Sequence, residues 1–166
     1  MKSIYHLKLY LACFGIITTA LGCDNKKTDL SYQNVPKDNL VADTIIYDVL
    51  ISNPNPEDTW TAECLDNLEK TLFVDQIFQG IYNGKLQPYD YYEDKPMRPS
   101  KIKRMEKNQE LQRNNIGKVQ FTERWYFDPV NLKMKKEVIS MVLGEQLLNT
   151  EGEVRGYKPV FKVILN

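Results

Sequence analysis

The stretch KVQFTERWYF, residues 118–127, decides the fold of this chain. Apolar and polar side chains alternate along it, which is typical of a β-strand whose two faces meet different surroundings. One face carries Val119, Phe121, Trp125 and Phe127, and the other carries Gln120, Thr122, Arg124 and Tyr126. The pattern predicts a strand at 118–127 with an apolar face turned toward the core.

Two further strand-like runs follow, at residues 134–143 and 157–165. Turn signals separate the three runs: DPVN at 128–131 and the segment 149–152, which ends in glycine. Short connections favour an antiparallel meander. A shorter β-branched run at 44–51, followed by NPNP at 53–56, predicts one more strand near the beginning of the domain.

The segments that precede the three predicted strands have the residue spacing of helices. Apolar residues recur three, four and seven positions apart over residues 61–83, and the stripe rotates near Thr71, so we expect two helices or one kinked helix there. A second helix is predicted at 100–113 with Ser100 as its cap, although it carries few apolar residues. Helices followed by a C-terminal antiparallel sheet place the chain in the α+β class.

The N-terminus has the pattern of an export signal. Lys2 and Lys8 precede an apolar run at 9–21, which is short for a resident membrane helix. The run ends in ALGC at 20–23, which resembles the lipobox of bacterial lipoproteins and implies acylation of Cys23. We therefore expect a lipoprotein signal at 1–22, a flexible tether at 23–42 and one domain at 43–166, anchored through acyl chains on Cys23 to the outer membrane and facing the periplasm. The alternative is ordinary cleavage that leaves Cys23 as a free thiol.

The composition narrows the classes of function. Removal of the signal leaves 144 residues with 20 basic and 22 acidic side chains, a net charge of about −2, so no electrostatic footprint for nucleic acid remains. The single histidine, His6, leaves with the signal, which argues against Ser-His-Asp, Cys-His and histidine-based zinc sites. Cys64 is the one cysteine beyond the lipid site, and we expect it to be buried in the first helix.

A carboxylate pair is the enzymatic chemistry that this composition leaves open. Its candidates are Glu123, Asp128, Glu137 and Glu153, which we expect to be solvated at strand edges. No glycine-rich nucleotide motif is present in the sequence. We therefore expect no catalytic residues, no metal and no cofactor, and read the chain as a non-enzyme.

Two segments carry concentrated charge. Residues 86–96 combine tyrosines with acidic side chains, and suit either a surface loop or a partner- or cation-binding loop. Six basic residues then lie between 95 and 107 against one acid, Glu106. They form either a solvated helix face or a patch for an anionic surface or an acidic partner protein.

Three phrases in order resemble one protein family: TLFVDQIFQGIYNGKLQPYD at 71–90, ERWYFD at 123–128 and GEVRGYKPVF at 152–161. They are similar to GldN, also called PorN, a periplasmic component of the type IX secretion and gliding machinery of Bacteroidota. The resemblance implies a non-enzymatic assembly role, with a GldK-like lipoprotein or further copies of the same chain as partners. This chain departs from the family in being short and in carrying its own lipid site.

The interaction surface that we expect joins Trp125 and Tyr126 with the turn Arg155, Gly156 and Tyr157. Gly152 and Gly156 flank the arginine, and suit either a backbone with unusual dihedral angles or a simple hairpin loop. The alternative function is a ligand-binding outer-membrane lipoprotein. In that hypothesis a half-open sheet and the loop at 86–96 form a pocket for a glycan or a peptide.

Overall fold

The computed structural model describes residues 39–165, so the expected signal, Cys23 and most of the expected tether lie outside the described residues. Within this part the chain is α+β, as the sequence predicts. The helices are α1 (Thr59–Leu65), α2 (Lys70–Tyr82) and α3 (Pro99–Lys107), with a 3-10 turn, η3 (Arg113–Asn115). The strands are β1 (Leu40–Leu50), β2 (Pro88–Tyr89), β3 (Ile116–Asp128), β4 (Lys133–Leu148) and β5 (Val154–Ile164).

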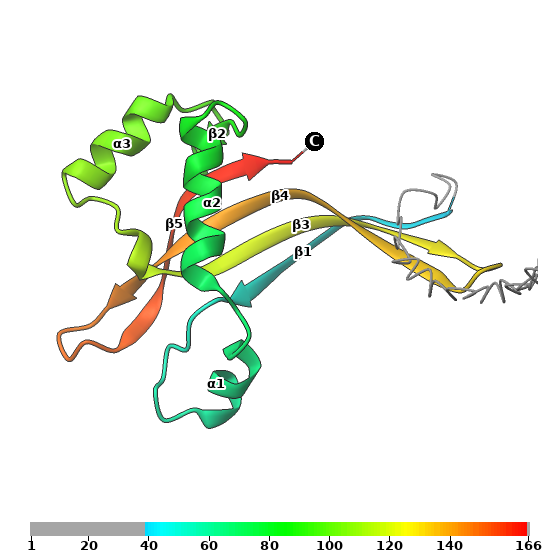
Figure 1. Cartoon of the computed structure of the whole chain (residues 1–166), viewed down its shortest axis with the longest axis horizontal. Coiled ribbons are helices and arrows are strands. Elements are labelled where there is room, and N and C mark those ends of the chain that lie inside the picture. Colours follow the sequence, from blue (N-terminus) through cyan, green and yellow to red (C-terminus); the bar gives the residue numbers. More distant parts are fainter. Residues whose placement is uncertain (1–38, 166) are drawn as a thin grey trace, which may run out of the picture. The chain divides into compact units, whose positions relative to one another are not determined.

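The strands form one antiparallel sheet in the order β1-β3-β4-β5-β2 (Figure 1). The predicted meander of β3, β4 and β5 is confirmed, and each strand is longer at one end or both than its apolar run. β1 lies at one edge and begins at Leu40, so the last residues of the expected tether belong to this strand. The two-residue β2, at the other edge, was not predicted because so short a strand has no periodicity.

The expected helix at 61–83 is two helices. Asp58 caps α1 by accepting a hydrogen bond from the Thr61 backbone at 3.1 Å, but α1 buries no residue. Of these two helices, only α2 buries an apolar stripe against the sheet. The prediction that the second helix reaches residue 113 is wrong, because α3 ends at Lys107 and Gln109 takes a left-handed backbone with φ of 59°.

The core lies between one face of the sheet and the helices. Phe78 of α2 is fully buried and packs edge-to-face against Phe161 of β5, with ring centroids 5.5 Å apart. Ile102 of α3 and Leu111 close the core from the side of the third helix. The core residues are Ile51, Val74, Ile77, Phe78, Ile81, Met97, Ile102, Leu111, Ile116, Val119, Met141, Leu143, Phe161 and Val163.

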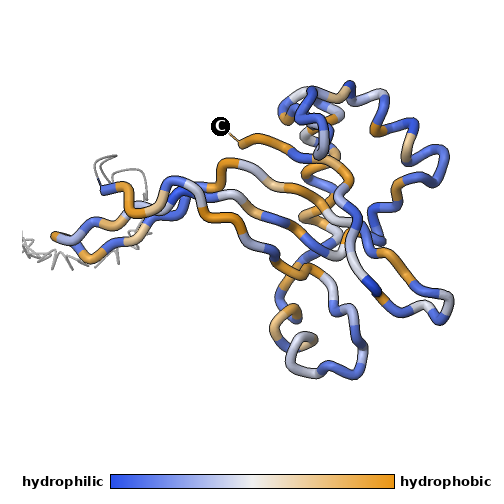
Figure 2. The backbone as a smooth tube through the Cα atoms, turned by 180° about the vertical axis from the view of Figure 1, so that it is seen from behind, coloured by the Kyte–Doolittle hydropathy of each residue, from blue (hydrophilic) through white to orange (hydrophobic). Residues whose placement is uncertain are grey.

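Part of the sheet extends away from these helices (Figure 1). We call it the arm and define it as residues 40–45 of β1 with residues 123–138 of β3, β4 and their turn. None of its residues belongs to the buried core, and Val138 alone packs partly against that core. Apolar residues nevertheless recur along the arm to its tip (Figure 2).

A β-bulge in β4 marks the beginning of the arm. Thr122 lies opposite Ser140, but the next residue, Glu123, lies opposite Val138, so Ile139 is extra. The bulge sets which side chains of β4 share a face with those of β3 beyond this point. As a result Met134 and Lys136 lie on the face of Phe127 and Trp125.

Among residues 39–165, the helices fall short of the length and apolarity that crossing a bilayer requires.

Candidate interaction surfaces

The structure divides the predicted surface into two parts. Trp125 lies in the arm opposite Lys136, whereas Gly156 lies opposite Leu147, near the other end of β4. At ~3.3 Å per residue this separation along β4 is roughly 35 Å. Each part is therefore a surface of its own, and a partner role for either remains a prediction.

The first part includes an apolar face of the arm. Trp125, Phe127 and Met134 share this face, which continues the helix-covered face of the sheet. Phe127 and Met134 are 38% and 41% exposed, and Val130 and Leu132 at the tip are 86% and 76% exposed. No helix or strand among the described residues covers this face. An apolar strip of this kind is unusual unless something binds it.

The opposite face of the arm is polar. Arg124 pairs with Asp43 across β3 and β1 at 2.9 Å. The Tyr126 hydroxyl donates to Glu137 at 2.9 Å, and Lys135 lies 5.5 Å from the centre of its ring. Tyr126 is therefore buried against Glu137 and Lys135. The sequence predicts it instead as part of an interaction surface.

Glu123 joins the arm to the covered part of the sheet. Its carboxylate accepts hydrogen bonds from the Tyr47 hydroxyl at 2.7 Å and the Trp125 indole at 2.8 Å, and only 4% of the residue is exposed. The expectation that Glu123 is solvated is wrong. The hydrogen bond to Glu123 and partial burial raise the pKa of Tyr47. The sequence held a signal for this, because Glu123 stands at an apolar-face position between Phe121 and Trp125.

The other candidate carboxylates hold turns and neighbours. Asp128 accepts from the Val130 and Asn131 backbones at 2.9 and 3.1 Å, which closes the tip of the arm. Glu153 accepts from the side chain of Asn149 at 2.9 Å in the β4–β5 turn. Among residues 39–165, no three histidine, cysteine or acidic side chains are grouped to hold a metal ion.

Cys64 is exposed, so its predicted burial is wrong. The reason is that α1, which carries it, has no buried residue.

The second part of the predicted surface is the β4–β5 hairpin. Gly152 has φ of +86°, which confirms one of the two unusual backbone positions; Gly156 has no such φ, and a side chain there would meet open space. Lys118 lies 5.1 Å from the centre of the Tyr157 ring. A hollow of about 160 Å³ lies beside this ring and is lined by Lys118, Tyr157 and Tyr91, the last from the tyrosine-rich loop at 86–96.

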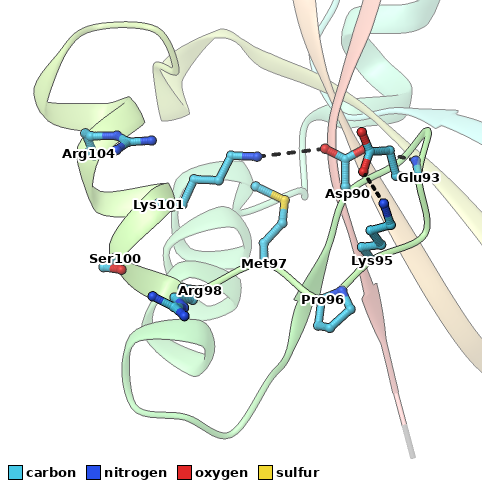
Figure 3. Close-up of a pocket in the computed structure, with 9 residues that line it drawn as sticks. All are labelled: Asp90, Glu93, Lys95, Pro96, Met97, Arg98, Ser100, Lys101 and Arg104. Atoms are coloured by element: carbon cyan, nitrogen blue, oxygen red, sulfur yellow. Dashed lines mark hydrogen bonds and ion pairs between the residues drawn. The ribbon is translucent and has the colours of Figure 1, made fainter.

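A larger hollow lies between α3 and the loop that precedes it (Figure 3). Its volume is about 630 Å³, and four of the six clustered basic residues line it: Lys95, Arg98, Lys101 and Arg104. Lys103 instead lies over the Tyr82 ring, 4.7 Å from its centre. The structure therefore divides the predicted basic patch between a hollow and a helix face.

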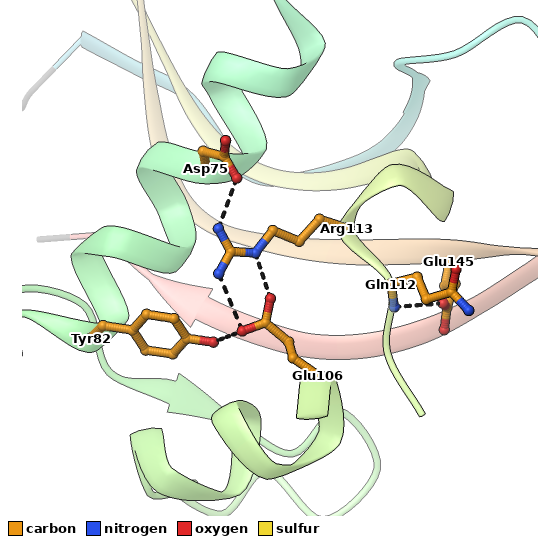
Figure 4. Close-up of polar contacts among 6 residues, drawn as sticks. All are labelled: Asp75, Tyr82, Glu106, Gln112, Arg113 and Glu145. Carbon is orange, nitrogen blue, oxygen red and sulfur yellow. Dashed lines mark hydrogen bonds and ion pairs between the residues drawn. The ribbon is translucent and has the colours of Figure 1, made fainter. Parts of the chain in front are cut away.

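A polar network ties α3 to α2 (Figure 4). Arg113 donates to Glu106 of α3 at 2.5 and 3.1 Å and to Asp75 of α2 at 2.8 Å, and its guanidinium lies 4.4 Å from the Phe78 ring centre. Tyr82 also donates to Glu106. Sequence reasoning missed this network, because its members come from three separate segments.

The network shifts the pKa values of its members. Burial, followed by the hydrogen bond to Glu106, raises the pKa of Tyr82 to about 12. Burial alone would raise the pKa of Glu106, but the hydrogen bonds from Arg113 and Tyr82 outweigh it, so this pKa lies below its usual value. The arrangement stabilises the charged carboxylate and the neutral phenol, as a structural clamp does.

Neither the protein-family models nor the curated proteins compared with this chain match it. The three phrases that resemble the GldN family fall on α2 with β2, on the arm portion of β3, and on the β4–β5 hairpin with β5. The family assignment stays a prediction from these phrases.

Proposed function

We propose that this chain is a non-enzymatic envelope lipoprotein that acts as a structural, protein-interaction component, similar to the GldN component of type IX secretion and gliding machinery. It contacts its partner with the apolar face of the arm. The observation that carries the proposal is the continuity of that face: the apolar side of the sheet runs past α2 and remains exposed at Phe127 and Met134.

The chemistry of this strip suits a protein partner. Aromatic and methionine side chains are enriched at protein contacts, where they bury a large apolar area. Trp125 adds an indole whose N–H is already bonded to Glu123, which holds the ring in place before any partner arrives. Lys136 lies opposite Trp125 on the same face, and its nitrogen is 4.6 Å from the centre of that ring.

The candidate carboxylates support a structural role. Glu123, Asp128 and Glu153 each hold a neighbouring side chain or turn. In the proposal the partner is another envelope protein that presents an apolar surface, such as a GldK-like lipoprotein, and a second copy of the chain is the competing outcome.

Site-directed photocrosslinking tests the proposal. A photoreactive phenylalanine analogue at Leu132, in the full chain within its native envelope, is expected to give a discrete crosslinked species. Phe127→Ser with Met134→Ser should abolish that species, because these changes remove the centre of the strip. Identification of the crosslinked chain distinguishes another envelope protein from a second copy.

The matched control is Leu147→Ser with Leu148→Ser at the other end of β4. These leucines are 36% and 53% exposed, so the control removes comparable apolar surface away from the arm. It should leave the crosslinked species intact. Recovery of monomer alone, or equal loss in both double variants, would contradict the proposed contact.

Membrane attachment is tested separately. In the proposal Cys23 carries the acyl chains, so Cys23→Ser should move the protein from the membrane pellet to the soluble fraction. Retention in the pellet without the cysteine would refute the lipoprotein assignment.

A further inference from the structure

We propose that the hollow between α3 and the preceding loop binds a phosphate group, as a phosphomonoester or as free phosphate. Two arginines without a carboxylate partner line a space large enough for such a group and what it is attached to. This site is distinct from the arm and does not depend on the partner proposed there.

The charge of the hollow is the first observation. Four basic side chains and two acids, Asp90 and Glu93, line it, which leaves an excess of two positive charges. Arg98 and Arg104 make no ion pair with any residue in the described part of the chain. A guanidinium offers parallel N–H donors whose spacing fits two oxygens of a phosphate.

The two acids in the hollow are already engaged. Glu93 pairs with Lys95 at 3.0 Å. One oxygen of Asp90 accepts the backbone N–H groups of Tyr92 and Glu93 at 3.0 and 3.1 Å, and these bonds help to hold the pKa of Asp90 below its usual value. The pairing of these acids with Lys95 and Lys101 leaves Arg98 and Arg104 as the charges in the hollow that have no ion-pair partner among residues 39–165 and attract an anion.

Lys101 supplies a third, movable donor. It reaches from α3 toward Asp90, but its nitrogen stays 4.0 Å from the nearer oxygen (Figure 3). A contact of this length is a weak ion pair between exposed groups. Lys101 is therefore free to turn from Asp90 to a bound phosphate, while the hydroxyl of Ser100 lines the same space.

The walls of the hollow are held in place before binding. Met97, at its base, is buried, and its backbone N–H donates to Pro88 at 2.8 Å. The Asp90 backbone N–H donates to Lys95 at 2.8 Å, which closes the loop on itself. Such preorganisation lowers the entropy cost of binding. The volume of about 630 Å³ exceeds what one phosphate ion needs, so a phosphate on a larger headgroup also fits.

Isothermal titration calorimetry on the full chain in detergent tests the site. The probes are inorganic phosphate and dihexanoyl phosphatidic acid, with dihexanoyl phosphatidylcholine as the lipid that lacks a phosphomonoester. Binding of both phosphate probes supports a site for free phosphate, and binding of the phosphatidic acid alone supports a lipid headgroup as the source. Absence of binding for both overturns the proposal.

Matched variants locate the binding. Arg98→Gln with Arg104→Gln should weaken it roughly 100-fold, because two charge-assisted contacts are lost. Lys103→Gln with Lys107→Gln removes the same amount of charge from α3 but outside the hollow, and should weaken binding severalfold at most. Equal loss in the two double variants overturns the proposal.

A conservative variant keeps the test decisive if the glutamine variant fails to fold. Arg98→Lys with Arg104→Lys retains the charge but loses the paired N–H donors, so its affinity should fall between that of the unchanged chain and that of the glutamine variant. Affinity equal to that of the unchanged chain would overturn recognition by the guanidinium groups.

Discussion

The covered part of the sheet and the arm belong to the same strands, yet their apolar faces have different surroundings. Along β3, Val119 is fully buried beneath the helices, whereas Phe127, on the same face, is 38% exposed. Alternation is the same in both regions, so it specifies which side chains share a face. It does not specify how far along the strand a helix covers that face.

The position of α2 determines how much of the apolar face of the sheet is buried. Its four buried residues, Val74, Ile77, Phe78 and Ile81, lie over the part of the sheet that contains Val119, Leu143 and Phe161. α2 crosses β3 and β4 rather than running along them (Figure 1), so it lies over only a short length of β4, a strand of 16 residues. One helix therefore leaves part of the long strands uncovered.

The largest effect is expected from Phe78→Ala compared with Phe127→Ala. Phe78 is fully buried against Phe161, so its truncation should lower the free energy of unfolding by about 3–5 kcal/mol. Phe127 is partly solvated already, and its truncation should cost about 1 kcal/mol or less. Urea denaturation followed by tryptophan fluorescence measures both. Similar losses in the two variants would show that the arm is packed as tightly as the core.

A smaller effect is expected at the junction of the two regions. Tyr47→Phe removes one of two donors to the buried Glu123 and should cost about 1–2 kcal/mol. Tyr157→Phe is the control, because its buried hydroxyl forms no hydrogen bond with the described residues, and its removal should be neutral or slightly stabilising. The same denaturation assay compares them. A greater loss for Tyr157→Phe would contradict the assigned hydrogen bonds.

The smallest expected effect is a pH dependence of the free energy of unfolding, and it arises in the helices that pack over the sheet. The folded-state pKa of Glu106 lies below the value of 4.5 for a free carboxyl, so its contribution to stability is present above about 4.5 and is lost as pH falls through the folded pKa. Glu106→Gln should therefore show less loss of stability on acidification than the unchanged chain. Urea denaturation at a series of pH values below 6 measures the difference. Identical pH profiles would exclude a role for Glu106 in acid sensitivity.

The sequence predicts the meander well because alternation over ten residues is a strong local signal. It predicts the ends of α1 and α3 poorly, because these depend on a left-handed residue at Gln109 and on whether α1 has a surface to pack on. The sequence predicts one interaction surface that joins Trp125 and Tyr126 with Arg155, Gly156 and Tyr157, but the structure places these two groups apart. Their distance apart follows from the length and register of β4, which the local pattern does not contain.

The polar clusters show the same limit. The contact of Arg113 with Glu106 and Asp75 joins three separate segments of the chain. Their spacing in the sequence gives no sign that these residues lie together. Glu123 differs, because its place in the alternation already put a carboxylate on the apolar face. A charged residue at an apolar-face position is thus a usable signal for a buried hydrogen-bonded group, and here it marks where the cover ends.

The bulge at Ile139 constrains how relatives of this chain can vary in length. Because Ile139 is the extra residue, its loss would leave Val138 opposite Glu123 and keep Met134 and Lys136 on the face of Phe127 and Trp125. A residue inserted between Glu137 and Val138 would instead place Glu137 opposite Trp125 and Lys135 opposite Phe127, because side chains alternate with a period of two. Deletions of two residues within the arm would preserve both faces. Within the arm, inherited changes in the length of β4 should therefore occur in pairs, whereas loss of the bulge residue alone should be tolerated.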